Sequence, residues 1–155
     1  LLDEVGAVIG EESHLVIPEG FAIPPDASEV HGITEALARH EGKPLPDVLD
    51  ALEHSLVGVG LVVAHNISFD IGVLRAESDR LRRGDRLFAH PTFCTMKNGA
   101  RMLRTPGVHG FRWPTLTELH DWLLAEPYPA RHRALEDARA CARCYLAMRK
   151  MGLAP

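Results

Sequence analysis

The chain has 155 residues, a length typical of one domain and sufficient to bury a core without disulfide or metal staples. Its net charge of −4 at pH 7 argues against broad, non-specific binding to a nucleic-acid backbone, but leaves room for a small site that works through metal ions. No apolar run approaches the roughly 20 residues that span a bilayer, and the N-terminus lacks the pattern of a signal peptide. We therefore expect a single cytoplasmic domain over residues 1–155, with no membrane partner.

The three cysteines form a poor disulfide framework because their number is odd. Cys141 and Cys144 make a C-x-x-C pair, but inside a helical pattern, and a structural zinc site usually needs four ligands. We expect Cys94, Cys141 and Cys144 to be buried or half-buried free thiols.

The predicted elements begin with strands and then alternate between strands and helices, which indicates an α/β fold with helices packed on a mixed sheet. The apolar run at 59–64 is typical of a strand buried on both faces. In chain order we expect strands at 5–9 and 14–17, a loop at 18–32, helices at 34–39 and 44–56, a strand at 59–64, a helix at 69–83, a strand at 92–96, and helices at 115–124 and 134–150.

Polar residues follow the buried strand directly, in the segment Ala64-His-Asn-Ile-Ser-Phe-Asp70. Ligands of open α/β sheets bind beyond the carboxyl ends of the strands, so a carboxylate at Asp70 can face a site. The positive end of a helix dipole favours its ionised form there. The alternative is that Asp70 is an ordinary first-turn residue, with Asn66 or Ser68 as the N-cap.

A second group of residues lies at the start of the last predicted helix, where His132 precedes Asp137 by five positions. Asp137 shares a helix face with Ala134, Cys141 and Cys144, and this face is apolar. A carboxylate on such a face is costly unless it is paired or bound to a metal. The alternative for His132 is a surface loop residue.

Two inward carboxylates and a nearby histidine suit two-metal hydrolysis of a phosphodiester. Carboxylates hold the two ions, and a histidine with a pKa near neutrality takes the proton of the attacking water. The spacing of the residues alone supports this chemistry only weakly.

Several segments resemble those of the DEDDh family of 3'→5' exonucleases, which includes proofreading subunits similar to the epsilon subunit of bacterial DNA polymerase III. Residues 64–70 resemble the second motif of the family, and residues 132–140, His-Arg-Ala-Leu-Glu-Asp-Ala-Arg-Ala, resemble the third. Residues 23–34, 93–97 and 113–120 also look like family segments. The similarity runs over residues 4–149 in the expected order.

The resemblance implies a ribonuclease H-like fold, a mixed sheet with helices on both faces. It also implies two divalent ions, Mg²⁺ or Mn²⁺, with Asp70 and Asp137 as ligands and His132 as the general base. The residues implied near the 3'-terminal nucleotide are His31, Asn66 and Phe69. The alternatives are a loop hydrogen bonder for His31 and a core aromatic for Phe69.

The first family motif, Asp-x-Glu, does not stand in its expected context. Leu1-Leu-Asp3 looks like the end of the first strand, and Glu4-Val-Gly-Ala-Val8 looks like the start of the second. Three explanations stay open. In the first, a loop between Asp3 and Glu4 is missing from the sequence, and Asp3 would then be the first metal ligand. In the second, the first strand is truncated. In the third, the chain is a degenerate homologue without catalysis.

The implied activity is release of nucleoside monophosphates from the 3' ends of DNA, with single-stranded DNA as the expected substrate. The alternatives are a non-catalytic module that binds nucleic acid or a DNA polymerase, and a DEDDh exoribonuclease acting on RNA. Two groups of basic residues could either contact the phosphate backbone or form an ordinary solvated surface. They are Arg75, Arg80, Arg82, Arg83 and Arg86, and Lys97, Arg101, Arg104 and Arg112.

Overall fold

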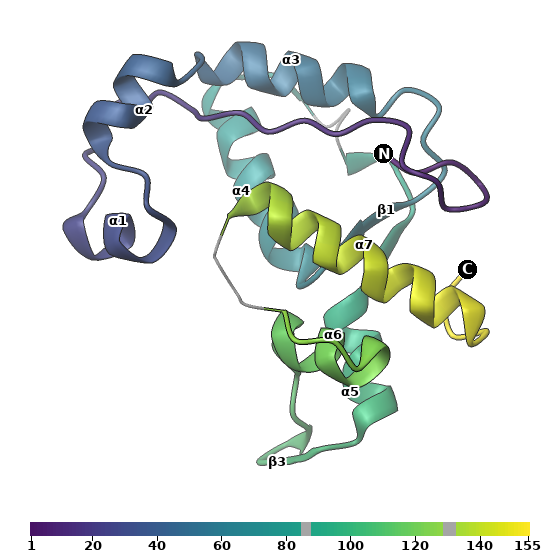
Figure 1. Cartoon of the computed structure of the whole chain (residues 1–155). Helices are drawn as coiled ribbons and strands as arrows, with labels where there is room; N and C mark the ends of the chain where they lie inside the picture. Colours follow the sequence, from purple (N-terminus) through teal and green to yellow (C-terminus); the bar gives the residue numbers. More distant parts are fainter. Residues whose placement is uncertain (85–87, 129–132) are drawn as a thin grey trace. The chain divides into compact units, whose positions relative to one another are not determined.

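The structure is a computed structural model that describes residues 1–84, 88–128 and 133–155 (Figure 1). Its contacts divide the chain into two compact units. Unit 1 comprises Leu1–Val59 with Arg131–Leu135, and unit 2 comprises Gly60–Ala130 with Glu136–Pro155. The expectation that they form a single domain stays a prediction.

The chain opens with a tight turn that Asp3 closes. Its Oδ1 accepts the backbone N–H groups of Val5 and Ala7 at 3.0 and 2.8 Å. Gly6 between them takes a φ of 90°, which favours glycine. Because these N–H groups bind a side chain, they are not available to a strand ladder. The predicted strand at 5–9 is wrong for this reason.

Isolated bridges stand where two short strands were predicted. Leu2 pairs with Val8 in the antiparallel sense, and Val16 pairs with Lys43 in the parallel sense. The predicted strand at 14–17 is therefore wrong as well. Val16 is an exposed side chain, so this segment gains little from packing that could extend its pairing.

Three helices complete the larger part of unit 1: α1 (Pro25–His31), α2 (Glu35–Glu41) and α3 (Leu45–Ser55). The prediction of a loop through residue 32 is wrong, because Pro25 starts α1 and Gly32 ends it in the left-handed region at φ 74°. The predicted N-cap is confirmed, since the hydroxyl of Thr34 accepts the N–H of Leu37 at 3.2 Å.

Unit 2 is built on two parallel strands, β1 (Val62–Ala64) and β2 (Thr92–Cys94). Helix α4 (Ile67–Arg80) follows β1, and α5 (Thr95–Leu103) follows β2. A small apolar cluster joins the strands and helices through Ile67, Cys94 and Met96. Strand β1 is shorter than predicted and only half-buried, and α5 was not predicted.

The remaining elements of unit 2 are β3 (Pro106–Gly107), β4 (Gly110–Phe111) and α6 (Leu116–Leu124), together with most of α7 (Ala134–Lys150). Strands β3 and β4 pair in the antiparallel sense. All three cysteines are free and buried, as predicted. Over the described ranges, the helices are too short or too polar to cross a membrane.

Candidate active site

The parallel pairing of β1 and β2 places the residues after both strands at one edge of the sheet. His65 and Asn66 follow β1, and Thr95 follows β2 and opens α5. Asp70 comes one turn into α4. The site therefore lies where ligands of α/β sheets usually bind.

Asp70 is exposed as a residue, yet its carboxyl group is close enough to protein for desolvation to raise its pKa. A hydrogen bond from its own backbone N–H opposes this rise. The Asp70 charge also acts on Cys141: burial is the main cause that raises the pKa of the Cys141 thiol to about 11, and the Asp70 carboxylate adds to the rise. Contacts place this face of α7 at the same edge of the sheet: the Thr95 hydroxyl lies 3.6 Å from Sγ of Cys141 and 3.4 Å from the carbonyl of Ala64, the last residue of β1.

Asp137 lies one turn before Cys141 on α7, so the two share a helix face. The Asp137 residue is half-buried, and its Oδ1 accepts a hydrogen bond from the hydroxyl of Tyr128 at 2.5 Å. Desolvation first, and the bond to Asp137 second, raise the pKa of Tyr128, which keeps its hydroxyl protonated. Asp70 and Asp137 thus belong to one region of unit 2.

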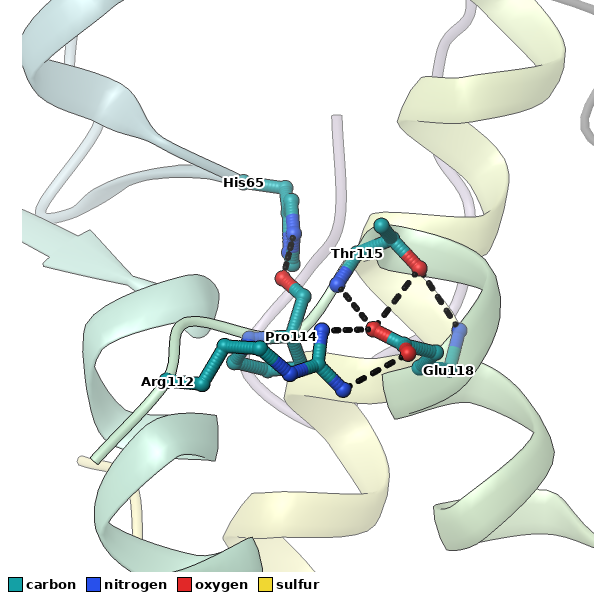
Figure 2. Close-up of polar contacts among 5 residues, drawn as sticks. All are labelled: His65, Arg112, Pro114, Thr115 and Glu118. Carbon is teal, nitrogen blue, oxygen red and sulfur yellow. Dashed lines mark hydrogen bonds and ion pairs between the residues drawn. The ribbon is translucent and has the colours of Figure 1, made fainter. Parts of the chain in front are cut away.

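His65 contacts the segment before α6 through Pro114 (Figure 2) and the start of α5 through Thr95. Its Nε2 donates to the carbonyl of Pro114 at 3.1 Å, and burial lowers its pKa, so the ring is neutral near pH 7. Its Nδ1 is then an acceptor for the hydroxyl of Thr95 at 3.0 Å. With both nitrogens engaged, His65 has a structural role.

The segment after β4 is held by an ion pair and a helix cap (Figure 2). Arg112 donates two hydrogen bonds to Glu118, at 3.0 and 2.8 Å. These bonds are the main cause that lowers the pKa of Glu118 to about 2. Glu118 also accepts the backbone N–H of Thr115, whose hydroxyl accepts the N–H of Glu118 in return. This capping box fixes the Pro114 carbonyl beside His65.

The first turn of α4 exposes an aromatic ring and has a contact with a basic side chain. Phe69 is 66% exposed, so the alternative of a core aromatic is wrong. Lys97 on α5 donates to the hydroxyl of Ser68 at 3.2 Å. Asn66 is the N-cap residue of α4, as the alternative reading expected, although it takes the left-handed conformation at φ 72° and its side chain makes no capping hydrogen bond.

The other predicted site residues lie outside unit 2 or outside the described residues. His31 is half-buried, and its Nδ1 accepts the N–H of Ile33 at 3.0 Å; the alternative reading expected a hydrogen bonder, but His31 lies in the last turn of α1 and not in a loop. Asp3 closes the turn in unit 1. His132 lies outside the described residues.

The donor set of this region suits Mg²⁺ or Mn²⁺ because both ions prefer carboxylate oxygens. A cation beside Asp70 would also offset the desolvation that raises the pKa of its carboxyl group. In the part of the chain that the structure describes, no three acidic, histidine or cysteine side chains converge on one point. Unit 2 thus contains two of the carboxylates that the sequence predicts as metal ligands, Asp70 and Asp137.

Sequence reasoning missed Tyr128 and Thr95 and left Lys97 undecided. Tyr128 precedes Asp137 by nine positions, a spacing that carries no helical or motif signal. Thr95 contacts His65 after β1, and Lys97 contacts Ser68 in α4; both contacts join residues far apart in the sequence and therefore depend on the tertiary fold.

Comparisons with known proteins define the class of this chain. The family model described as Exonuclease (RNase_T) matches residues 3–145. A DNA polymerase III subunit epsilon of Salmonella typhimurium is 30% identical over 155 residues, which cover 94% of this chain and 60% of that protein. A Mycobacterium tuberculosis protein that carries the name of a bifunctional exonuclease/endonuclease is 37% identical over 136 residues.

A solved structure, exonuclease X in complex with 5' overhanging duplex DNA, matches with a TM-score of 0.64 and 28% identity. The match covers 97% of this chain and 80% of that one. The chain therefore belongs to the exonuclease family, as a DEDDh-type member similar to epsilon, and has its α/β, ribonuclease H-like fold. It spans 20% of the Mycobacterium relative and 66% of a Treponema pallidum epsilon subunit.

Proposed function

We propose that this chain is a metal-dependent 3'→5' exonuclease that releases nucleoside monophosphates from DNA 3' ends by two-metal-ion hydrolysis. The observation that carries the proposal is that Asp70 begins the helix after β1, while α7, the helix of Asp137, contacts Thr95 after the parallel strand β2 through Cys141. The DNA in the exonuclease X complex supports DNA as the substrate class.

In this proposal Asp70 and Asp137 hold the ions, Asp3 adds a third carboxylate, and His132 takes the proton of the attacking water. Two divalent ions, when bound, lower the pKa of that water and stabilise the charge that develops at phosphorus.

The 3'-terminal nucleotide is assigned to the residues at the start of α4. The exposed ring of Phe69 suits stacking on a base. The Lys97 ammonium beside Ser68 suits a backbone phosphate. Asn66 adjoins Phe69, and His31 is proposed near the same nucleotide.

A non-catalytic module is the second candidate, and one observation favours it. Asp3 already uses one carboxylate oxygen for two backbone N–H groups, and no Asp-x-Glu stands in the family context. Such a module would bind nucleic acid or a DNA polymerase without metal.

Incubation of single-stranded DNA with the purified protein separates these candidates. Mononucleotides should be released in the presence of Mg²⁺ or Mn²⁺, and EDTA should stop their release. An RNA of the same sequence tests the exoribonuclease alternative in the same assay. If neither nucleic acid shortens with either ion, and calorimetry detects no Mn²⁺ binding, the chain is the non-catalytic module.

A further inference from the structure

One phenol contacts a proposed metal ligand directly. The Tyr128 hydroxyl donates to Oδ1 of Asp137 at 2.5 Å. Tyr128 follows α6, whereas Asp137 lies in the first turn of α7. The bond therefore joins two elements of unit 2 at one carboxylate oxygen.

Tyr128 is itself held at its backbone and its ring. Its N–H donates to Oδ1 of Asp121 at 3.2 Å. Its ring packs against the fully buried His120, with 5.3 Å between the ring centroids. His120 in turn lies 3.1 Å from the carbonyl of Glu126, an acceptor for its Nδ1. Because the ring is already ordered, its hydroxyl reaches Asp137 at little further cost in side-chain entropy.

The segment between α6 and α7 has a second connection to α7. Arg143 donates to the carboxylate of Glu126 at 2.5 Å. This pair is exposed and contributes little stability, but it does not involve Tyr128. Loss of the Tyr128 hydroxyl therefore leaves one attachment of the segment to α7 in place.

We propose that Tyr128 is a positioning residue that orients Asp137 for binding a divalent ion. The inference rests on the proposed function, since it takes Asp137 as a metal ligand. The phenol occupies Oδ1 and leaves Oδ2 as the oxygen for the ion. Hydrogen bonds to ligating carboxylates fix their orientation, and their loss typically costs 10–100-fold in metal affinity or activity.

Tyr145 offers a matched control for the substitution Tyr128→Phe. Tyr145 is the other tyrosine of the chain, and its hydroxyl donates a hydrogen bond to the Pro155 carbonyl at 2.6 Å. Its ring packs edge-on against Phe93. Each Tyr→Phe variant removes one hydroxyl and one hydrogen bond and keeps the ring.

Calorimetric titration with Mn²⁺ alone tests the inference without nuclease turnover. We expect Tyr128→Phe to bind Mn²⁺ about 10-fold more weakly than wild type and Tyr145→Phe to bind like wild type. In the nuclease assay, Tyr128→Phe should need about 10-fold more Mn²⁺ for half-maximal rate, with an unchanged KM for DNA. Saturating Mn²⁺ should restore its kcat, which a folding defect would not allow.

Equal or tighter Mn²⁺ binding by Tyr128→Phe would overturn the inference and leave the proposed function standing. A wild-type protein that binds no Mn²⁺ and cuts no DNA would overturn both. If Tyr128→Phe does not fold, Asp121→Ala replaces it, because this change removes only the backbone anchor of Tyr128. Weaker Mn²⁺ binding by Asp121→Ala supports the inference, and unchanged binding contradicts it.

Discussion

The carboxylates proposed to bind metal lie in two regions that differ in what their oxygen atoms already contact. In unit 2, Asp70 lies in the first turn of α4, and Asp137 accepts one phenol hydroxyl. In unit 1, Oδ1 of Asp3 accepts two backbone N–H groups and closes a turn. The unit 2 carboxylates are placed by helices, whereas Asp3 helps to form the structure that places it.

Because of this difference, substitutions in the two regions can distinguish an effect on metal binding from an effect on local structure. Removing the charge of Asp70 or Asp137 should change metal binding and leave the helices intact. Removing the side chain of Asp3 should change both metal binding and local structure. Substitution by asparagine and by alanine therefore gives different information in the two regions.

The largest effect is expected in unit 2. Asp70→Asn and Asp137→Asn should each lower kcat at least about 100-fold, since loss of a ligand costs no less than loss of its outer-shell partner. Thermal unfolding should stay close to that of wild type. The rate of mononucleotide release measures the effect.

Asp79→Asn is the matched control, because Asp79 is an exposed aspartate on the same helix as Asp70. It should keep the wild-type rate. A wild-type rate in Asp70→Asn would remove Asp70 from the site.

The next comparison uses Asp3. Asp3→Asn keeps an amide oxygen that accepts the N–H groups of Val5 and Ala7, but it is a poor metal ligand. We expect it to lose nuclease activity to the same degree as Asp137→Asn while unfolding at the wild-type temperature. Asp3→Ala should lose activity and also about 1 kcal/mol of stability or more, because two N–H groups lose their acceptor.

Full activity in Asp3→Asn, together with the stability loss in Asp3→Ala, would show that Asp3 only closes the turn. The third carboxylate would then have to come from elsewhere in the protein.

A smaller effect is expected at Lys97. Its ammonium lies 3.2 Å from the Ser68 hydroxyl in the first turn of α4. Lys97→Ala should raise KM for single-stranded DNA and reduce the slope of log K against log salt by about 0.7, the value for one lost phosphate contact. Fluorescence anisotropy with Ca²⁺ in place of Mg²⁺ measures the slope, and Lys150→Ala is the control on an exposed helix end. Equal slopes in both variants would exclude a phosphate contact.

The smallest effect is a pH dependence at Glu118. Arg112 lowers the folded-state pKa of Glu118 to about 2 from an ordinary 4.5. The resulting stabilisation is therefore present above pH 4.5 and is lost as the pH falls from 4.5 toward 2. The pair is exposed, so we expect less than about 1 kcal/mol. The difference in thermal unfolding between wild type and Glu118→Gln should shrink from pH 7 to pH 3; a constant difference would contradict this assignment.

The helices with strong sequence signals could be predicted. Thr34 caps α2, and α7 begins and ends where its periodicity indicates. The strand at 5–9 failed because the Asp3 side chain competes for its N–H groups, a contact that residue pattern does not encode. Helix α5 was missed because a β-branched, aromatic run leads directly into it at Thr95.

Only part of the candidate site could be predicted from the sequence. The order of the family-like segments predicted the family, and the family match bears this out. The roles of Asp70, Asp137 and His132 stay predictions. The contacts that modify the site could not be predicted, because Tyr128 and Lys97 reach it from other elements of the tertiary fold.

End-labelled DNA tests the central claim most directly. A single-stranded oligonucleotide labelled at its 3' or its 5' end is followed over time with Mn²⁺ and excess protein. The account predicts that the 3' label leaves as a mononucleotide from the first time points. The 5' label should stay in a series of products that shorten one nucleotide at a time, and Asp137→Asn should stop both processes. Early release of the 5' label, internal fragments, or equal rates in Asp137→Asn would contradict a 3'→5' exonuclease that acts through this site.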